Sequence, residues 1–313
     1  MTRRIKVTLA GFGQIGRMLY RKWSGSPLLE VVGVADPLYA GQSADTLADV
    51  SGKGIVIGKQ PAPGAEVAVI ASGSRMKEVL PVAEQCVEMG MNVVTTCEGM
   101  FFDRSAEVRH LGELAAKRQC AVLAGGINPG FLMDYLPLVL SGASMNIRSV
   151  KVERYQDASF RRTRFQKKIG CGLTVKAFEE ALQEGKLCHI GLKQSAEFLA
   201  SALGWIVGEM VETCRPVTSD GNFVSGIHQI LTVTDENRKE IIRLDFLAAA
   251  GGVESCDRIV IDGEPRIESV ISGGLPGDAG TCAVMTSLVR KIASCGKTGL
   301  LTLQDLSPFA GHI

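Results

Sequence analysis

The residues "IKVTLAGFGQIG", 5–16, carry the strongest structural signal in this 313-residue chain. Its first half is an apolar run of strand length, and Gly11, Gly13 and Gly16 then follow in the pattern G-x-G-x-x-G. Glycine turns of this kind are common, but here the turn opens a helical stretch, and Asp36 ends the next strand twenty residues beyond Gly16. This context predicts a dinucleotide-binding unit, with a structural turn that holds no ligand as the alternative.

The predicted cofactor is NAD(H). Gly11 permits the tight turn, Gly13 lets the backbone approach the pyrophosphate, and Gly16 lets helix and strand pack closely. The N-terminus of the following helix then faces the negative phosphates. Asp36 would accept hydrogen bonds from ribose hydroxyls and repel a 2′-phosphate, and the Pro-Leu pair after it supplies no cation, so NAD is favoured over NADP. The full predicted set in this part of the chain is Gly11, Phe12, Gly13, Gln14, Ile15, Gly16 and Asp36.

Apolar strands alternate with helical stretches up to about residue 126. Further strands are predicted at 28–36, 66–72, 92–96 and 120–126, with helices up to about 89 and at 105–119. Strands that are apolar on both faces and separated by helices are typical of a parallel sheet covered by helices. The sequence therefore predicts an α/β fold with a doubly wound Rossmann sheet, in a dinucleotide-binding domain at 1–127.

The pattern changes after about residue 145. Longer, half-exposed strands are predicted at 147–155, 223–235, 239–250 and 257–265. Helices are predicted at 175–184, 193–210 and 279–293. These elements predict a second, α+β domain at 128–276, built on an open, mainly antiparallel sheet.

Composition and charge argue against several classes of protein. Hydrophobic residues make up 46% and charged residues 21%, as in ordinary globular proteins, and a net charge of +1 gives no global field toward nucleic acid or membrane. No membrane span is predicted, and the basic N-terminus runs into the glycine turn instead of a cleavage site, so we expect a cytoplasmic protein. The nine cysteines are odd in number and form no C-x-x-C pair, so we expect reduced thiols and no metal site.

The loops after two later strands carry candidate site residues. Ligands of doubly wound sheets bind outside the carboxyl ends of the strands. The loop "ASGS" follows one strand, and its Ala71, Ser72 and Gly73 are predicted to lie beside the nicotinamide half, unless the loop is an ordinary turn. In "TTCEGM", Glu98 follows the next strand. A carboxylate there is costly to desolvate unless it is exposed, paired or used, so Glu98 is a candidate substrate ligand or base, with a capping or surface glutamate as the alternative.

Cys97 offers a rival chemistry, because a Rossmann enzyme that oxidises aldehydes uses a cysteine nucleophile and a histidine base. The expected place for such a cysteine is where the chain enters the second domain. There the sequence reads "GGINPGF", residues 125–131, without a thiol. We therefore favour Glu98 over Cys97 as the reactive group.

Five segments resemble one known family: "TTCEGM", "AGGINPGFLMDYLPLVLSG", "DASFRRTRFQKKIGCGLT", "CHIGL" and "GLLTLQDL". They are similar to the 2,4-diaminopentanoate dehydrogenases and to the wider group of native amine dehydrogenases with a dihydrodipicolinate-reductase-like N-terminal domain. The resemblance implies that the last helix returns to the first domain, which 277–313 would complete, and that the second domain forms a homodimer through its sheet. It also implies NAD(P)-dependent oxidative deamination, reversible as reductive amination, with the family's acidic catalytic residue at Glu98. The family's second acidic residue falls on Gly99, a departure that leaves the substrate open.

This chemistry assigns roles to further residues. An ammonium group must lose a proton before its carbon can give hydride to the nicotinamide, and the resulting iminium is hydrated to release ammonia. The best-matching substrate is 2,4-diaminopentanoate, which would give 2-amino-4-oxopentanoate. Its carboxylate needs a cation, and the candidates are Arg161, Arg162 and Lys167, with a solvated basic loop as the alternative. Asn128 would hold the nicotinamide carboxamide or the substrate, or only form a turn, and His189 would line the pocket or be structural.

Three other functions stay open on the sequence. One is a dehydrogenase of simple amines without an amino-acid substrate. Another is a reductase like dihydrodipicolinate reductase, which the lack of a His-His pair disfavours. The third is a non-catalytic NAD-binding redox sensor, which would bind the dinucleotide but need no carboxylate where Glu98 stands.

Overall fold

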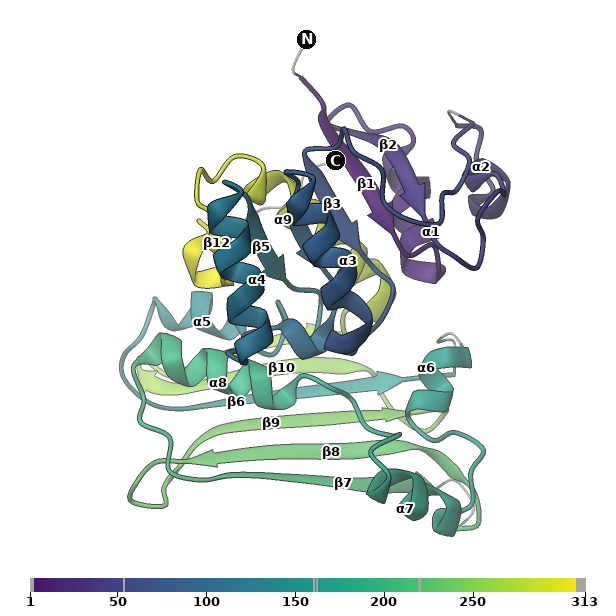
Figure 1. Cartoon of the computed structure of the whole chain (residues 1–313). Helices are drawn as coiled ribbons and strands as arrows, with labels where there is room; N and C mark the ends of the chain where they lie inside the picture. Colours follow the sequence, from purple (N-terminus) through teal and green to yellow (C-terminus); the bar gives the residue numbers. More distant parts are fainter. Residues whose placement is uncertain (1–2, 53, 160, 162, 219–220, 308–313) are drawn as a thin grey trace. The chain divides into compact units, whose positions relative to one another are not determined.

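The computed structural model describes residues 3–52, 54–159, 161, 163–218 and 221–307 (Figure 1). Its contacts divide the chain into two units. Unit 1 comprises Met1–Phe131 and Gly277–Ile313, and unit 2 comprises Leu132–Pro276. Each unit has its own sheet.

Unit 1 is built on a six-stranded sheet in the order β12-β5-β4-β3-β1-β2, in which every pairing is parallel. All residues of β3 and β5 are buried, as expected for strands covered on both faces. The Rossmann fold predicted from the glycine turn is thereby confirmed. The elements are β1 (Ile5–Ala10), α1 (Gln14–Trp23), β2 (Leu29–Ala35), α2 (Ala44–Ala48), β3 (Val67–Ile70), α3 (Met76–Glu88), β4 (Asn92–Thr95), η1 (Glu98–Met100), α4 (Ala106–Lys117), β5 (Ala121–Ala124), α9 (Gly277–Ile292), β12 (Gly299–Leu300) and η2 (Leu303–Asp305).

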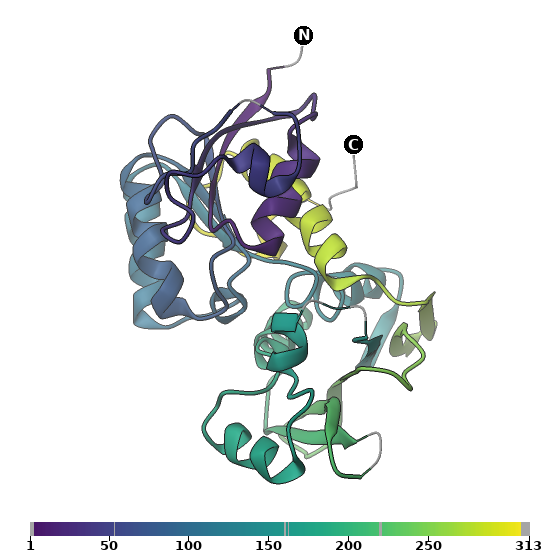
Figure 2. The same cartoon turned by 90° about the vertical axis from the view of Figure 1, so that its right-hand side faces the viewer.

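The sheet of unit 1 has a topological switch point between β1 and β3. The chain first places β2 on one side of β1 and then returns to place β3 on the other side. Helices α3 and α4 cover one face, and α1 and α9 pack together on the other (Figure 2). The indole N–H of Trp23 in α1 donates to the Thr286 hydroxyl of α9 at 3.0 Å, which ties the end of the chain to its beginning.

Unit 2 is built on a second six-stranded sheet, in the order β11-β10-β6-β9-β8-β7. The β6–β9 pairing is parallel and the other pairings are antiparallel, so the expectation of a mainly antiparallel sheet is confirmed. One face carries the apolar core, to which α8 contributes residues such as Leu192, Ala196 and Leu199. The elements are α5 (Tyr135–Ser141), β6 (Met145–Asp157), α6 (Thr163–Lys168), α7 (Val175–Gln183), α8 (Leu192–Leu203), β7 (Met210–Thr218), β8 (Val224–Thr234), β9 (Glu240–Ala249), β10 (Cys256–Glu264) and β11 (Ile267–Ser272).

One predicted helix is too long. The prediction ran it from 193 to 210, but α8 ends at Leu203, where Gly204 adopts φ +69° and the Trp205 N–H returns to the Ala200 carbonyl at 2.9 Å. A left-handed glycine that closes the last turn is a common helix stop. Residues 205–209 form no regular element, and β7 begins at Met210. This edge strand was missed from the sequence because most of its side chains are exposed or half-buried on both faces.

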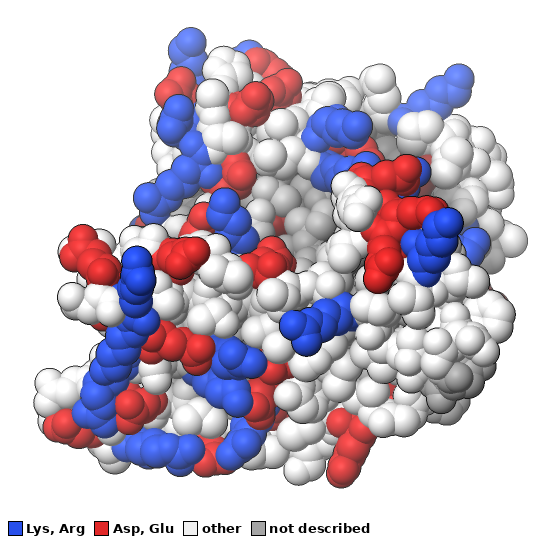
Figure 3. All heavy atoms as spheres, turned by 90° about the horizontal axis from the view of Figure 1, so that it is seen from below, with Lys and Arg blue, Asp and Glu red and all other residues white. Residues whose placement is uncertain are grey.

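The surface of the described residues carries both signs of charge. On the face seen in Figure 3, basic and acidic side chains are interspersed, in keeping with 34 basic and 33 acidic residues in the chain. Among the described helices, none combines the length and the hydropathy that a membrane crossing requires.

Candidate active site

The two predicted nucleotide loops touch at the switch point of unit 1. Gly11 follows β1 with φ +96°, and its N–H donates to the Ala35 carbonyl of β2 at 2.8 Å. A Cβ atom on Gly11 would lie 2.6 Å from the Ser72 nitrogen and 2.7 Å from the Ala71 carbonyl carbon. A Cβ on Gly16 would overlap the Gly11 carbonyl oxygen. These two glycines are therefore required by the protein's own packing.

Gly13 is different, because its own backbone does not demand glycine. It is the N-cap of α1 with φ −70°, and a Cβ built on it meets none of the described atoms within 4 Å. The first turn of α1, which begins with Gln14 and Ile15, holds no acidic side chain. The open space in front of a helix N-terminus fits the pyrophosphate of a dinucleotide, which the partial positive charge of the helix end would stabilise.

Asp36 stands at the end of β2, where it closes the glycine turn. Its Oδ2 accepts the Phe12 N–H at 2.7 Å, and its Oδ1 accepts the Leu38 N–H at 2.9 Å. A carboxylate oxygen has two lone pairs, so both oxygens keep acceptor capacity for ribose hydroxyls. The fit of these residues to a dinucleotide thus rests on the turn, the open N-terminus and the positioned carboxylate.

Arg17 lies near Asp36 and was not predicted. Its Nε donates to the Phe12 carbonyl at 3.0 Å, and its Cζ lies 4.6 Å from the centroid of the Tyr39 ring. Leu38, between Asp36 and Tyr39, is 83% exposed. The sequence after Asp36 supplies no cation, but α1 supplies one from the other side of the turn. No sequence pattern signals this, because the contact joins two elements.

Glu98 is held beside the loop that follows β3. The Thr96 N–H donates to the Ile70 carbonyl at 3.0 Å, and the Cys97 N–H donates to the Thr95 hydroxyl at 3.1 Å, which turns the chain out of β4. Glu98 then begins η1 and is half-buried, and the Gly99 N–H donates to the Ser74 carbonyl at 3.2 Å. The strand end therefore places Glu98 directly next to the "ASGS" loop.

The surroundings of Cys97 do not suit a catalytic nucleophile. Its side chain is 1% exposed. Burial, with smaller contributions from the Glu98 and Glu78 carboxylates, raises the pKa of its thiol to about 11. A neutral, buried thiol is a poor nucleophile, which supports the choice of Glu98.

Asn128 lies at the same edge of the sheet, in unit 1. The Gly125 N–H donates to the Thr95 carbonyl at 2.9 Å, and the Ile127 N–H donates to the Thr281 hydroxyl of α9 at 3.4 Å. Gly130 closes the turn with φ +118°, and Asn128 is 8% exposed. The ends of β1, β2, β3, β4 and β5 thus bring every predicted residue of unit 1 to one edge.

In unit 2, the predicted residues Arg161 and His189 lie beside a row of residues that crosses the sheet. Register partners on the helix-covered face run from β10 through β6, β9 and β8 to β7, and we name them the transverse row: Asp257, Arg154, Phe246, Gln229 and Cys214. Arg154 is 1% exposed and pairs with Asp257 at 3.2 Å. Burial lowers the pKa of Arg154 to about 10, which still leaves it charged at neutral pH.

Arg161 is held next to this row. Its Nη1 donates to the Gln156 side chain at 3.1 Å, and its Cζ lies 4.1 Å from the Phe165 ring centroid. The Gln156 amide and the Arg154 Nη2 both donate to the Leu275 carbonyl, at 3.3 and 3.0 Å. Arg161 is therefore part of an ordered polar network instead of a freely solvated loop.

His189 is anchored to the transverse row from the segment between α7 and α8. Its ring stacks on Phe246 with 4.8 Å between ring centroids. The backbone N–H of His189 donates to the Gln229 side-chain oxygen, and the backbone carbonyl of His189 accepts from the Gln229 side-chain amide, both at 2.9 Å. Lys167 is exposed, and Arg162 lies outside the described residues.

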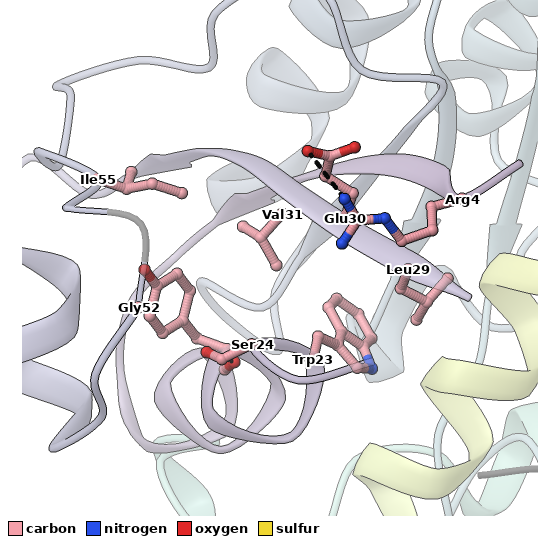
Figure 4. A pocket seen from close by; sticks show the side chains of 9 residues that line it. Arg4, Trp23, Ser24, Leu29, Glu30, Val31, Gly52 and Ile55 are labelled. Atoms are coloured by element: carbon pink, nitrogen blue, oxygen red, sulfur yellow. Dashed lines mark hydrogen bonds and ion pairs between the residues drawn. The ribbon is translucent and has the colours of Figure 1, made fainter. Parts of the chain in front are cut away.

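A shallow pocket in unit 1 holds none of the predicted residues. It is lined by Trp23, Leu29 and Val31 among others, with room for about one water molecule, and the Arg4–Glu30 ion pair of 3.7 Å borders it (Figure 4). The pocket lies at the start of β2, whereas Asp36 follows the end of β2. Among the described residues, no group of three or more His, Cys, Asp or Glu is arranged to hold a metal ion.

A comparison with protein families decides the relationship. The model of the 2,4-diaminopentanoate dehydrogenase C-terminal domain matches residues 131–311, more than half of the chain. The chain belongs to this family. The resemblance inferred from the five motifs is confirmed, and with it the expectation of an amine-dehydrogenase relationship at the level of the family.

One curated relative and two solved structures are also similar to the chain. The chain is 26% identical to 2,4-diaminopentanoate dehydrogenase from Acetoanaerobium sticklandii, over 97% of this chain and 93% of that protein. The solved amine dehydrogenase from Mycobacterium smegmatis matches with a TM-score of 0.84 and 18% identity, covering 99% of this chain and 98% of that one. GenD2 of gentamicin A biosynthesis, solved with NAD, matches with a TM-score of 0.53 and 14% identity, covering 86% of this chain and 73% of that one.

Proposed function

We propose that this chain catalyses the NAD-dependent oxidative deamination of an amine, with 2,4-diaminopentanoate as the first substrate to test and 2-amino-4-oxopentanoate and ammonia as products. The reaction is reversible as reductive amination. The observation that carries the proposal is the position of Glu98, one strand beyond the junction of the two nucleotide loops and tied to the second loop through Gly99 and Ser74. Family membership supports the same reaction class.

Glu98 acts as the general base for the substrate ammonium and for the attacking water. Its carboxylate binds the substrate ammonium, accepts its proton and leaves a neutral amine, whose carbon can then give up hydride. A bound nicotinamide supplies the hydride acceptor. After that proton has passed to solvent, the carboxylate takes a proton from the water that adds to the iminium carbon and returns it to the nitrogen, so that ammonia leaves as the carbonyl forms. Asn128, at the end of the neighbouring strand β5, would fix the nicotinamide amide or the substrate by hydrogen bonds.

Asp36 sets the preference for NAD. Both of its oxygens are fixed by backbone N–H groups, so its negative charge cannot turn away from a 2′-phosphate. Asp36→Ser should lose about 10–100-fold in NAD binding, the scale of hydrogen bonds to a charged group. The same variant should gain NADP activity, because Arg17 is already ordered near the turn. Wild type that uses NADP as well as NAD would contradict this assignment.

Arg161 is the preferred ligand for a substrate carboxylate. Gln156 and Phe165 hold its guanidinium, which saves the entropy of ordering a long side chain on binding. Lys167 is exposed and would contribute only at long range. His189, stacked on Phe246, would contact an apolar part of the substrate.

The homodimer and the cytoplasmic location stay proposals. For the homodimer, support comes from the sheet face of unit 2 opposite the helices, where Val211 is 48% and Val270 is 52% exposed. Light scattering at micromolar concentration measures the mass directly, and a monomer would exclude this dimer.

The deciding experiment follows NADH formation with 2,4-diaminopentanoate and with a simple monoamine, in wild type and in Glu98→Gln. The substitution keeps the shape and removes the charge, so kcat should fall at least ~100-fold, the scale of a general base. NADH binding should persist. Arg161→Leu should raise KM for the diamino acid and leave the monoamine unchanged. Full turnover in Glu98→Gln would refute the role of Glu98, and NAD binding without turnover on any amine would favour a redox sensor.

A further inference from the structure

Two cysteines that are far apart in the sequence meet at the edge of the unit 2 sheet. Cys188 lies in the segment between α7 and α8, and Cys214 lies in the edge strand β7. Their sulfur atoms are 2.6 Å apart, and both side chains are half-buried, so a small reagent can reach them. The pair was not foreseen from the sequence, where no C-x-x-C motif marks it.

A hydrogen bond and two charged side chains act on the two sulfurs. The Cys188 S–H donates to the Cys214 sulfur. This hydrogen bond stabilises a single negative charge shared by the two sulfurs, so it lowers the pKa at which the pair loses its first proton and raises the pKa for the second. Glu212 and Lys168 are the charged groups that face the pair, and they act in opposite directions on Cys188. Whichever sulfur is deprotonated can attack a small disulfide, and its neighbour at 2.6 Å is in position to resolve the mixed disulfide.

We propose that Cys188 and Cys214 form a reversible disulfide by exchange with a low-molecular-weight disulfide such as oxidised glutathione. The thiolate of one cysteine attacks one sulfur of the small disulfide and releases one small thiolate. The other cysteine then loses its proton and attacks the sulfur of the first, which releases the second small thiolate. The two cysteine sulfurs are oxidised by two electrons, the small disulfide is reduced by two, and the protons end on the two released thiols.

The disulfide would fasten the segment that carries His189. In the reduced protein that segment is held by the paired hydrogen bonds of Gln229 and by the stack on Phe246. A covalent link to β7, closing a loop that contains α8, would keep it in place when those contacts open. Any effect on amine turnover rests on the proposed function, but formation of the disulfide does not. The test therefore measures the number of free thiols first.

The test titrates free thiols after equilibration in a series of oxidised to reduced glutathione ratios, with peptide mapping of the quenched protein. Wild type should lose two thiols together, the map should join Cys188 to Cys214, and dithiothreitol should restore both. The melting temperature of the oxidised form should rise by roughly 5–10 °C, the scale for closing a loop of this length. Single-site variants Cys188→Ser and Cys214→Ser should lose the paired step.

Cys171→Ser is the matched control, because Cys171 is also half-buried in unit 2 but bonds to the Ser225 carbonyl at 2.9 Å. It should retain the two-thiol step. A wild type that keeps nine thiols at every glutathione ratio would overturn the proposal. So would a map that joins other cysteines, or a paired step that persists in Cys188→Ser.

Discussion

Replacing Gly11 and Gly13 separately with alanine should damage the protein in two different ways. Gly11 has φ +96°, and its new Cβ would lie 2.6 Å from the Ser72 nitrogen. The left-handed backbone costs an L-residue about 1–2 kcal/mol, and the overlap adds about 1–3 kcal/mol. Gly11→Ala should therefore lose about 3 kcal/mol of folding stability. At about 2–4 °C per kcal/mol for a domain of this size, its melting temperature should fall by roughly 6–12 °C.

Gly13→Ala should leave the folding stability almost unchanged and weaken the binding of the dinucleotide. Gly13 has φ −70°, and its Cβ meets none of the described atoms within 4 Å. An alanine N-cap costs about 1 kcal/mol at most, so the melting temperature should fall by less than about 4 °C. The new methyl group points into the space assigned to the pyrophosphate, and overpacking of about 1–3 kcal/mol corresponds to roughly 10–100-fold weaker NADH binding.

Two measurements check this pair of variants. Thermal unfolding without cofactor reports the stability of the fold, and titration of NADH fluorescence reports its affinity. The reasoning fails if Gly13→Ala melts as early as Gly11→Ala, because its Cβ would then meet the protein. It also fails if Gly13→Ala binds NADH like wild type, because the pyrophosphate would then lie elsewhere.

Two further substitutions test the neighbouring site and the buried network. Cys97→Ser should keep turnover within about two-fold, since a thiol with a pKa of about 11 is almost fully protonated at neutral pH. A variant that folds but has no activity would instead support covalent catalysis by Cys97. Asp257→Asn leaves Arg154 buried without its anion and should cost about 3–5 kcal/mol, measured by denaturant unfolding. Arg148→Ala, which removes only exposed ion pairs to Asp262 and Glu264, is the control and should unfold almost like wild type.

Much of unit 1 could be predicted because local signals and topology agree there. The glycine turn fixed the order of strand, helix and acidic residue, and parallel strands must end at one edge. The expected residues after β1, β2, β3, β4 and β5 therefore share that edge. Glu98 could be picked out because a charge at the end of an apolar strand needs a reason. The roles of these residues stay predictions until the variants are measured.

What the sequence could not supply are contacts that depend on register and packing. Arg17 of α1 reaches Tyr39 in the segment that follows β2, and no spacing rule marks that approach. The transverse row forms because antiparallel and parallel pairings align single residues of five strands, and a one-residue shift would dissolve it. Edge strand β7 lacks a buried face and so lacks the alternation that identifies strands.

The return of the chain to unit 1 affects the order in which the protein can be completed on the ribosome. The sheet of unit 1 begins with the first strand but gains β12 and its covering helix α9 only after Gly277. All strands of unit 2 have been made by then. During synthesis the second unit can therefore close while the first still exposes the face that α9 will cover. A chain cut at residue 276 would keep every predicted residue of the site and still lack the helix that seals its scaffold.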